Sequence, residues 1–160
     1  MSTRRKNILD KIGSLIPGYT GYSERSDKRK TEKCFRDQNA LLLEKSEKNI
    51  IEFQKLLLLQ NNTSLMKEWE FTRKQINTMT SILKHAIYGE SSFFSSTQIK
   101  ENELEEIMNF DEEIADRVQL IFKATESELS EDLTKTFISK CIKEIDSSFL
   151  NRSNFISKYK

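Results

Sequence analysis

The chain has 160 residues, of which 36% are apolar and 32% charged, and its net charge at neutral pH is +1. This length suits one domain, and the shortage of apolar residues argues against a large globular core and favours an elongated helical body. The longest apolar run, residues 56–59, is far too short to span a bilayer.

Proline and glycine are confined almost entirely to the first 21 residues. Pro17 lies there with the glycines at positions 13, 18 and 21, and Gly89 is the one exception. Because these two residue types are the strongest breakers of regular structure, the chain beyond residue 22 is predicted to be mostly long helices.

Residues 1–16 have the pattern of a short amphipathic helix. Ile8, Ile12 and Leu15 share one helical face, and basic side chains flank them at positions 4, 5, 6 and 11. Residues 17–22 (PGYTGY) predict a turn, because proline fixes φ and glycine permits positive φ. We therefore expect residues 1–22 to form an amphipathic segment and elbow attached to the main body.

Four longer helices are predicted in residues 23–150, which we take as the body. They span residues 23–59, 65–88 and 98–123, and a last helix begins after Ser127 or Ser130 and ends near residue 150. Residues 151–160 are polar and are expected to fray.

The expected fold is all-α. It is an antiparallel up-down four-helix bundle with a long first helix, preceded by the short N-terminal amphipathic helix, because short connections make consecutive helices antiparallel neighbours. A hairpin-like coiled-coil dimer is the competing architecture.

Charge is segregated along the chain. Residues 1–36 carry ten Lys or Arg and four Asp or Glu, whereas residues 90–133 carry three and thirteen. Arg25, Arg29, Lys33 and Arg36 share one face of the first long helix, a basic stripe that predicts contact with an anionic partner. The acidic residues predict a cationic partner, unless the two regions complement each other within one molecule or between copies.

No catalytic, cofactor-binding or metal-binding signature is found. His85 is the only histidine and has no partner base or Glu-x-x-His companion. Glu103-x-x-Glu106 and Glu113-x-x-Asp116 resemble the magnesium-binding pairs of all-helical nucleotide pyrophosphatases, but two pairs on one helix do not converge on an ion. We expect no enzymatic activity, no cofactor and no metal.

The elbow and two later segments also suggest a family. Residues 16–22 (IPGYTGY), then Tyr88-Gly89, Phe93-Phe94 and residues 108–111 (MNFD), are similar to a group of small helical proteins of bacteria and archaea that begin with an "IPGY-GY" elbow. The resemblance covers residues 8 to about 121. It implies a helical fold and one family-wide domain, and it implies no activity.

Together these patterns predict a non-enzymatic adaptor or scaffold subunit that acts through contacts with a protein partner or with copies of itself. The alternatives are a peripheral protein that binds anionic membranes through its N-terminal helix, and a weak nucleic-acid-binding module. The predicted partner-binding residues are Ile8, Ile12, Tyr19, Tyr22, Arg25, Arg29, Lys33, Arg36, Phe93, Phe94, Glu112 and Glu113.

The expected location is cytoplasmic, with a membrane-peripheral position as the alternative. The two cysteines, Cys34 and Cys141, have no CxxC spacing, and no secretory leader is evident, which fits a reducing compartment.

Overall fold

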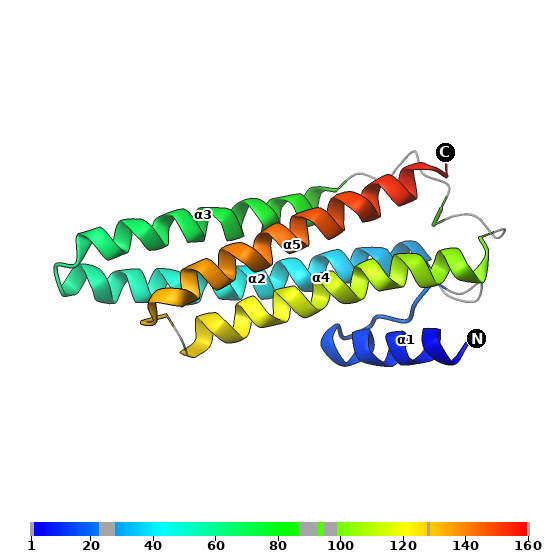
Figure 1. The fold of residues 1–160 in the computed structure, drawn as a ribbon, viewed down its shortest axis with the longest axis horizontal. Coiled ribbons are helices and arrows are strands. Elements are labelled where there is room, and N and C mark those ends of the chain that lie inside the picture. Colours follow the sequence, from blue (N-terminus) through cyan, green and yellow to red (C-terminus); the bar gives the residue numbers. More distant parts are fainter. Residues whose placement is uncertain (1, 23–27, 87–92, 95–98, 128, 160) are drawn as a thin grey trace.

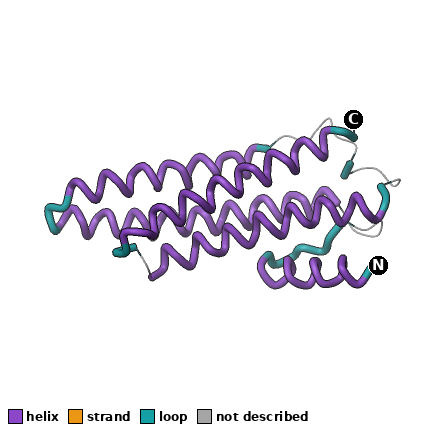
Figure 2. The backbone as a smooth tube through the Cα atoms, viewed as in Figure 1, coloured by secondary structure: helices purple, strands orange, loops and turns teal. Residues whose placement is uncertain are grey.

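The protein is all-helical throughout its described part. The computed structural model describes residues 2–22, 28–86, 93–94, 99–127 and 129–159. Within them it contains five helices and no strand (Figures 1 and 2). The helices are α1 (Thr3–Leu15), α2 (Lys28–Leu59), α3 (Thr63–His85), α4 (Glu101–Ser127) and α5 (Asp132–Ser157).

Helices α2 to α5 form the body. Helix α2 packs against α3 and α4, and α5 packs against α3 and α4. Arg73 on α3 bonds to Glu47 on α2, and Arg36 on α2 reaches the carbonyl oxygens at the C-terminal end of α3, so these two helices are antiparallel. Helices α4 and α5 are also antiparallel, since Arg117 bonds to Glu144 and Asp111 to Arg152 (Figure 1).

The order of neighbours differs in part from the expectation. Consecutive packing is found for α2–α3 and for α4–α5, but α3 and α4 share no packing contact among the described residues. These two helices therefore lie on a diagonal of the body. The connection between them, residues 86–100, is longer than the tight loops that place consecutive helices side by side.

Helix α5 also runs further than predicted, and the expectation of a frayed tail over residues 151–160 is wrong for its first seven residues. Arg152 and Ile156 are fully buried and continue the inward face of Ile145 and Phe149. Burial of this last turn stabilises a segment that its polar composition alone would leave frayed. At the start of α3, Asn62 is the cap residue, and its side chain accepts a hydrogen bond from the Leu65 N–H.

Helix α1 lies along the side of α4, rather than at the end of the body (Figure 1). Ile8 and Ile12 are buried in the common core. Two ion pairs border this apolar contact: Lys11 Nζ lies 2.5 Å from Glu112 Oε1, and Arg5 lies 3.8 Å from Glu101. The basic N-terminal helix and acidic α4 therefore complement each other within one molecule.

The elbow after α1 depends on two glycines with positive φ. Gly18 has φ +87° and Gly21 has φ +76°, a region that side chains with a Cβ rarely adopt. A Cβ on Gly21 would also come within 3.2 Å of Leu9 on α1. Gly21 therefore allows the chain to turn while α1 remains packed beside it.

Gly21→Ala is expected to lower the free energy of unfolding by about 1–3 kcal/mol, because alanine is strained at this φ and crowds Leu9. Thermal and urea denaturation followed by circular dichroism measure it. Gly13→Ala is the matched control: Gly13 lies inside α1, and a Cβ there meets just one atom, at 3.9 Å. Gly13→Ala should raise the free energy of unfolding by roughly 0.5–1 kcal/mol. Equal effects from the two substitutions would contradict this account of the elbow.

Candidate functional site

Two features of the molecule are candidates for function, and they lie at opposite ends of the body. The first is a buried polar cluster centred on Asp111 of α4 and Arg152 of α5. Both side chains are 0% exposed, and Arg152 Nε donates to Asp111 Oδ1 at 2.6 Å. Two ions removed from water in this way are stable only when further hydrogen bonds complete their shells.

The elbow supplies those bonds to Asp111. Tyr19 and Tyr22 both donate their hydroxyl protons to its Oδ2 atom, at 2.7 and 2.5 Å. Arg152 Nη2 in turn donates to the hydroxyl oxygen of Tyr22 at 3.2 Å. The tyrosine rings meet edge to face, with centroids 5.8 Å apart. The turn sequence therefore places two aromatic donors on a carboxylate some 90 residues further along the chain.

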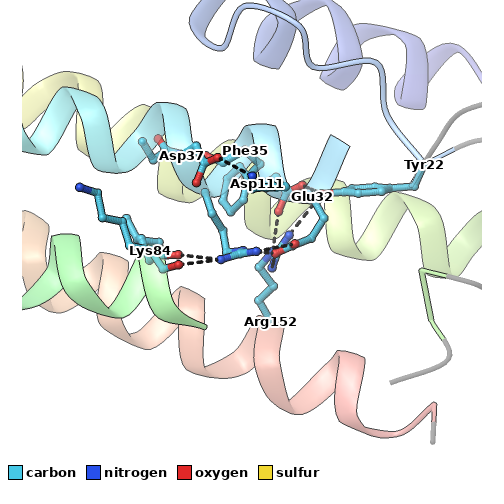
Figure 3. A network of polar contacts seen from close by, with 11 residues as sticks. Tyr22, Glu32, Phe35, Asp37, Lys84, Asp111 and Arg152 are labelled. Atoms are coloured by element: carbon cyan, nitrogen blue, oxygen red, sulfur yellow. Dashed lines mark hydrogen bonds and ion pairs between the residues drawn. The ribbon is translucent and has the colours of Figure 1, made fainter. Parts of the chain in front are cut away.

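Helices α2 and α3 complete the cluster (Figure 3). Glu32 Oε1 lies 3.6 Å from Arg152 Nη1 and accepts a 2.6 Å bond from Arg36 Nε. Arg36 Nη1 then donates to the carbonyl oxygens of Leu83 and Lys84 at the end of α3. The guanidinium of Arg152 also lies 4.6 Å from the ring centroid of Phe35. We call Tyr19, Tyr22, Glu32, Arg36, Asp111 and Arg152 the polar hub.

The hub is electrically balanced, with two carboxylates and two guanidinium groups. Burial raises the pKa of Tyr19 and Tyr22 well above the usual value, and the negative charge of Asp111 raises it further. Both tyrosines therefore stay protonated at neutral pH and act as donors. Asp111, Tyr22 and Arg152 are 0% exposed, so the centre of the hub is closed to solvent, and its contacts join the elbow to four helices.

Six of the predicted partner-binding residues are buried, which corrects their interpretation as exposed anchors. Ile8 and Ile12 pack in the core beneath α1, and Tyr19 and Tyr22 belong to the hub. Phe93 is 0% and Phe94 is 5% exposed; they contact each other, Phe93 also contacts Phe155 on α5, and Phe94 contacts Tyr22 of the elbow. Aromatic residues in a predicted loop looked accessible, but here they seal one end of the core.

The predicted basic stripe does not form one free surface. Arg25 lies outside the described residues. Arg36 is part of the hub, Lys33 lies 3.9 Å from Asp37, and Arg29 is exposed but has an interaction of its own. On α4, Glu112 pairs with Lys11, and Glu113 accepts a bond from Ser148. Most of these charges are thus engaged within the chain.

The second candidate is a set of exposed apolar side chains at the other end, where α2 turns into α3. Of the nine large apolar residues exposed in the described part of the chain, six lie at or near this end, on α2, α3 and the first turns of α5. We call them the apolar end: Leu56, Leu58, Leu59, Phe71, Leu133 and Phe137.

Sequence reasoning missed the apolar end. Leu133 and Phe137 have the spacing of a core face with Cys141 and Ile145, but they are 78% and 39% exposed, because Thr134 and Ile138 face inward instead. The run of four leucines at residues 56–59 was a signal for this surface. Four consecutive residues point to all sides of a helix, and the helix at the tip of a hairpin cannot bury all of its sides.

The surroundings of Trp69 show how this end is built. Its ring meets Phe53 edge to face at 5.8 Å, and the Lys135 ammonium lies 5.7 Å from the ring centroid. Its buried Nε1 has no hydrogen-bond partner. Beside it, Phe71 lines an open groove of about 440 Å³ between α3 and α5.

Comparisons with known proteins add no assignment: no family model, curated protein or solved structure matches the chain. Among the described residues, no group of three or more His, Cys, Asp or Glu side chains is placed to hold a metal ion. In the same part of the chain, none of the helices combines the length and apolar character that crossing a membrane requires.

Arg152→Met is expected to lower the free energy of unfolding by about 3–5 kcal/mol, because it leaves the buried carboxylates of Asp111 and Glu32 without their shared cation. Urea denaturation measures the change. Lys33→Met is the control: it removes an exposed cation from a surface ion pair on α2 and should lower the free energy of unfolding by less than about 1 kcal/mol. A similarly small effect of Arg152→Met would show that the hub is not essential for stability.

Stability is also expected to fall above about pH 10, where tyrosines in the unfolded chain lose their protons. Because their pKa is raised in the folded state, Tyr19 and Tyr22 keep their protons there, so the folded state binds more protons and ΔG of unfolding decreases with pH. The double variant Tyr19→Phe, Tyr22→Phe should be less stable at neutral pH but should lose less stability between neutral and alkaline pH.

Tyrosinate absorbance and circular dichroism, recorded together during an alkaline titration, test this expectation. In the wild type, the absorbance due to Tyr19 and Tyr22 should appear with the loss of helix. The absorbance that the double variant lacks is the part due to Tyr19 and Tyr22. Ionisation of both residues near the usual tyrosine pKa, with the helical signal unchanged, would contradict the hub geometry.

Proposed function

We propose that this protein is a non-enzymatic adaptor or scaffold subunit that works through protein–protein contacts made by the apolar end. The observation that carries the proposal is the gathering of exposed apolar side chains at that end, with Leu56, Leu58 and Leu59 at 55%, 55% and 81% exposure. Single apolar residues are common on protein surfaces, but a group of them at one end is typical of an interaction site.

The polar hub supports the same function by fixing the opposite end. A scaffold needs a rigid body to present its contact surface, and the hub joins the elbow, α2, α3, α4 and α5 through buried hydrogen bonds. In this proposal the body is an antiparallel four-helix bundle, stiffened at one end and open to a partner at the other.

The membrane and nucleic-acid alternatives have less support. Membrane binding by α1 would require Ile8 and Ile12 to leave their buried positions and Lys11 to leave Glu112. Binding of phosphates by the basic stripe would compete with the ion pairs of Arg36 and Lys33. We therefore place the contact surface at the apolar end, instead of at the N-terminal segment that the sequence favoured.

A native affinity purification tests this function with three versions of the full chain. The wild type should retain a protein partner at a stoichiometric level, and the double variant Leu56→Ser, Leu59→Ser should lose it, because both side chains are exposed on the hairpin. The matched control is Leu41→Ser, Leu150→Ser, which changes two exposed leucines elsewhere and should retain the partner.

Circular dichroism should show the same helix content for all three versions. The proposal fails if the control variant loses the partner and the hairpin variant keeps it. It also fails if no version retains any protein and the wild type shows no self-association in solution.

A further inference from the structure

The α2–α3 hairpin extends past the other two helices and so creates a step (Figure 1). Asn49 on α2 bonds to Thr125 at 3.2 Å, two residues before α4 ends at Ser127. Helix α2 continues to Leu59, so about eight of its residues extend beyond α4, roughly 12 Å at 1.5 Å per residue. On the other side, Lys135 near the start of α5 bonds to Glu68, at the second turn of α3.

The tip of the hairpin carries no charged side chain and exposes leucine, whereas Glu52 and Lys55, earlier in the extended part, pair with each other. Residues 56–66 contain no Asp, Glu, Lys or Arg. Leu57 is 4% exposed and faces α3, while its neighbours Leu56, Leu58 and Leu59 point to the other sides of the helix. An exposed apolar surface of this kind is typical of a contact with an apolar face of a partner.

The α4–α5 turn, at the base of this step, is acidic. Glu126, Glu131 and Asp132 are exposed around the α4–α5 turn, beside the exposed Leu133. Lys67 is exposed where the hairpin joins the body. None of these four charged side chains has an ion-pair partner within the described part of the chain. The same molecule thus presents an uncharged hairpin tip with a lysine at its base and, around the α4–α5 turn, acidic side chains beside an exposed leucine.

We propose that the partner at the apolar end is a second copy of this chain, in a two-fold symmetric dimer. Each copy places its hairpin over the α4–α5 turn of the other, so that the hairpin leucines bury against Leu133 and Lys67 approaches Glu131 and Asp132. A two-fold axis brings the same patch of both copies together, so the patch has to be self-complementary. A hairpin tip without net charge and a lysine at its base, placed opposite the acidic α4–α5 turn, meet that requirement, because Lys67 then faces Glu131 and Asp132.

This inference rests on the proposed function, since it names the partner for the same surface. The overlap of about 12 Å is small for a permanent dimer, so the association should be reversible and should increase with protein concentration. Sedimentation velocity and light scattering of the full chain, from low micromolar to submillimolar concentration, should show a shift from 18.8 kDa towards twice that mass.

Charge reversal gives the sharper test. Lys67→Glu alone should dimerise at least about tenfold more weakly, because two carboxylates then face each other in both symmetric contacts. Glu131→Lys alone should do the same with two ammonium groups; the side chain of Glu131 makes no capping bond, so the helix should tolerate this change. Mixed in equal amounts, the two variants should restore the dimer, because each contact then pairs opposite charges.

Leu59→Ser should weaken the dimer about tenfold or more, and Leu150→Ser should leave it unchanged. A monomeric wild type at every concentration overturns the inference, as does a dimer that is insensitive to Leu59→Ser or a variant mixture that stays monomeric. If the wild type is monomeric but still retains a different protein that the Leu56→Ser, Leu59→Ser variant loses, the adaptor function stands and the second copy is the wrong partner.

Discussion

The ion pair between Asp111 and Arg152 is the interaction on which the rest of the structure depends. Removing two charges from water is costly, and the cost is offset here because every neighbouring element contributes a partner. The elbow provides two tyrosine hydroxyls, α2 provides Glu32, and Arg36 carries the cluster to the end of α3. A helical body with a modest apolar content thus gains a specific register from polar contacts, which tolerate misalignment far less than leucine contacts do.

Much of the fold could be predicted because helix formation is governed by local pattern. The scarcity of proline and glycine beyond residue 22 predicted the long helices, and the spacing of Ile8 and Ile12 predicted α1. The diagonal placement of α3 and α4 could not be predicted, because the sequence gives the length of their connection but not which helices become neighbours. The last seven residues of α5 were missed because Arg152 looks like a surface residue until its partners are known.

The candidate site was harder to predict for a related reason. Whether an apolar residue is exposed depends on where the neighbouring helices end in space. The pattern of a single helix contains no information on that. Phe93 and Phe94 were expected on the surface but are buried against α5 and the elbow, whereas Leu133 fits a core periodicity but is exposed. The charged segments were identified correctly, but their pairing within one molecule, as in Lys11 with Glu112, could be settled only by the fold.

The bond between Tyr22 and Arg152 joins residues 130 positions apart, and this separation bears on how the chain folds. During synthesis the elbow emerges first, and the cation that completes its hydrogen bonds emerges last. Until then Tyr22 lacks its bond to Arg152, and Asp111, which both elbow tyrosines contact, lacks its buried cation. The elbow should consequently be among the last parts to reach its final hydrogen bonding, although it is made before the four helices of the body. Closure of the elbow would then mark completion of the body.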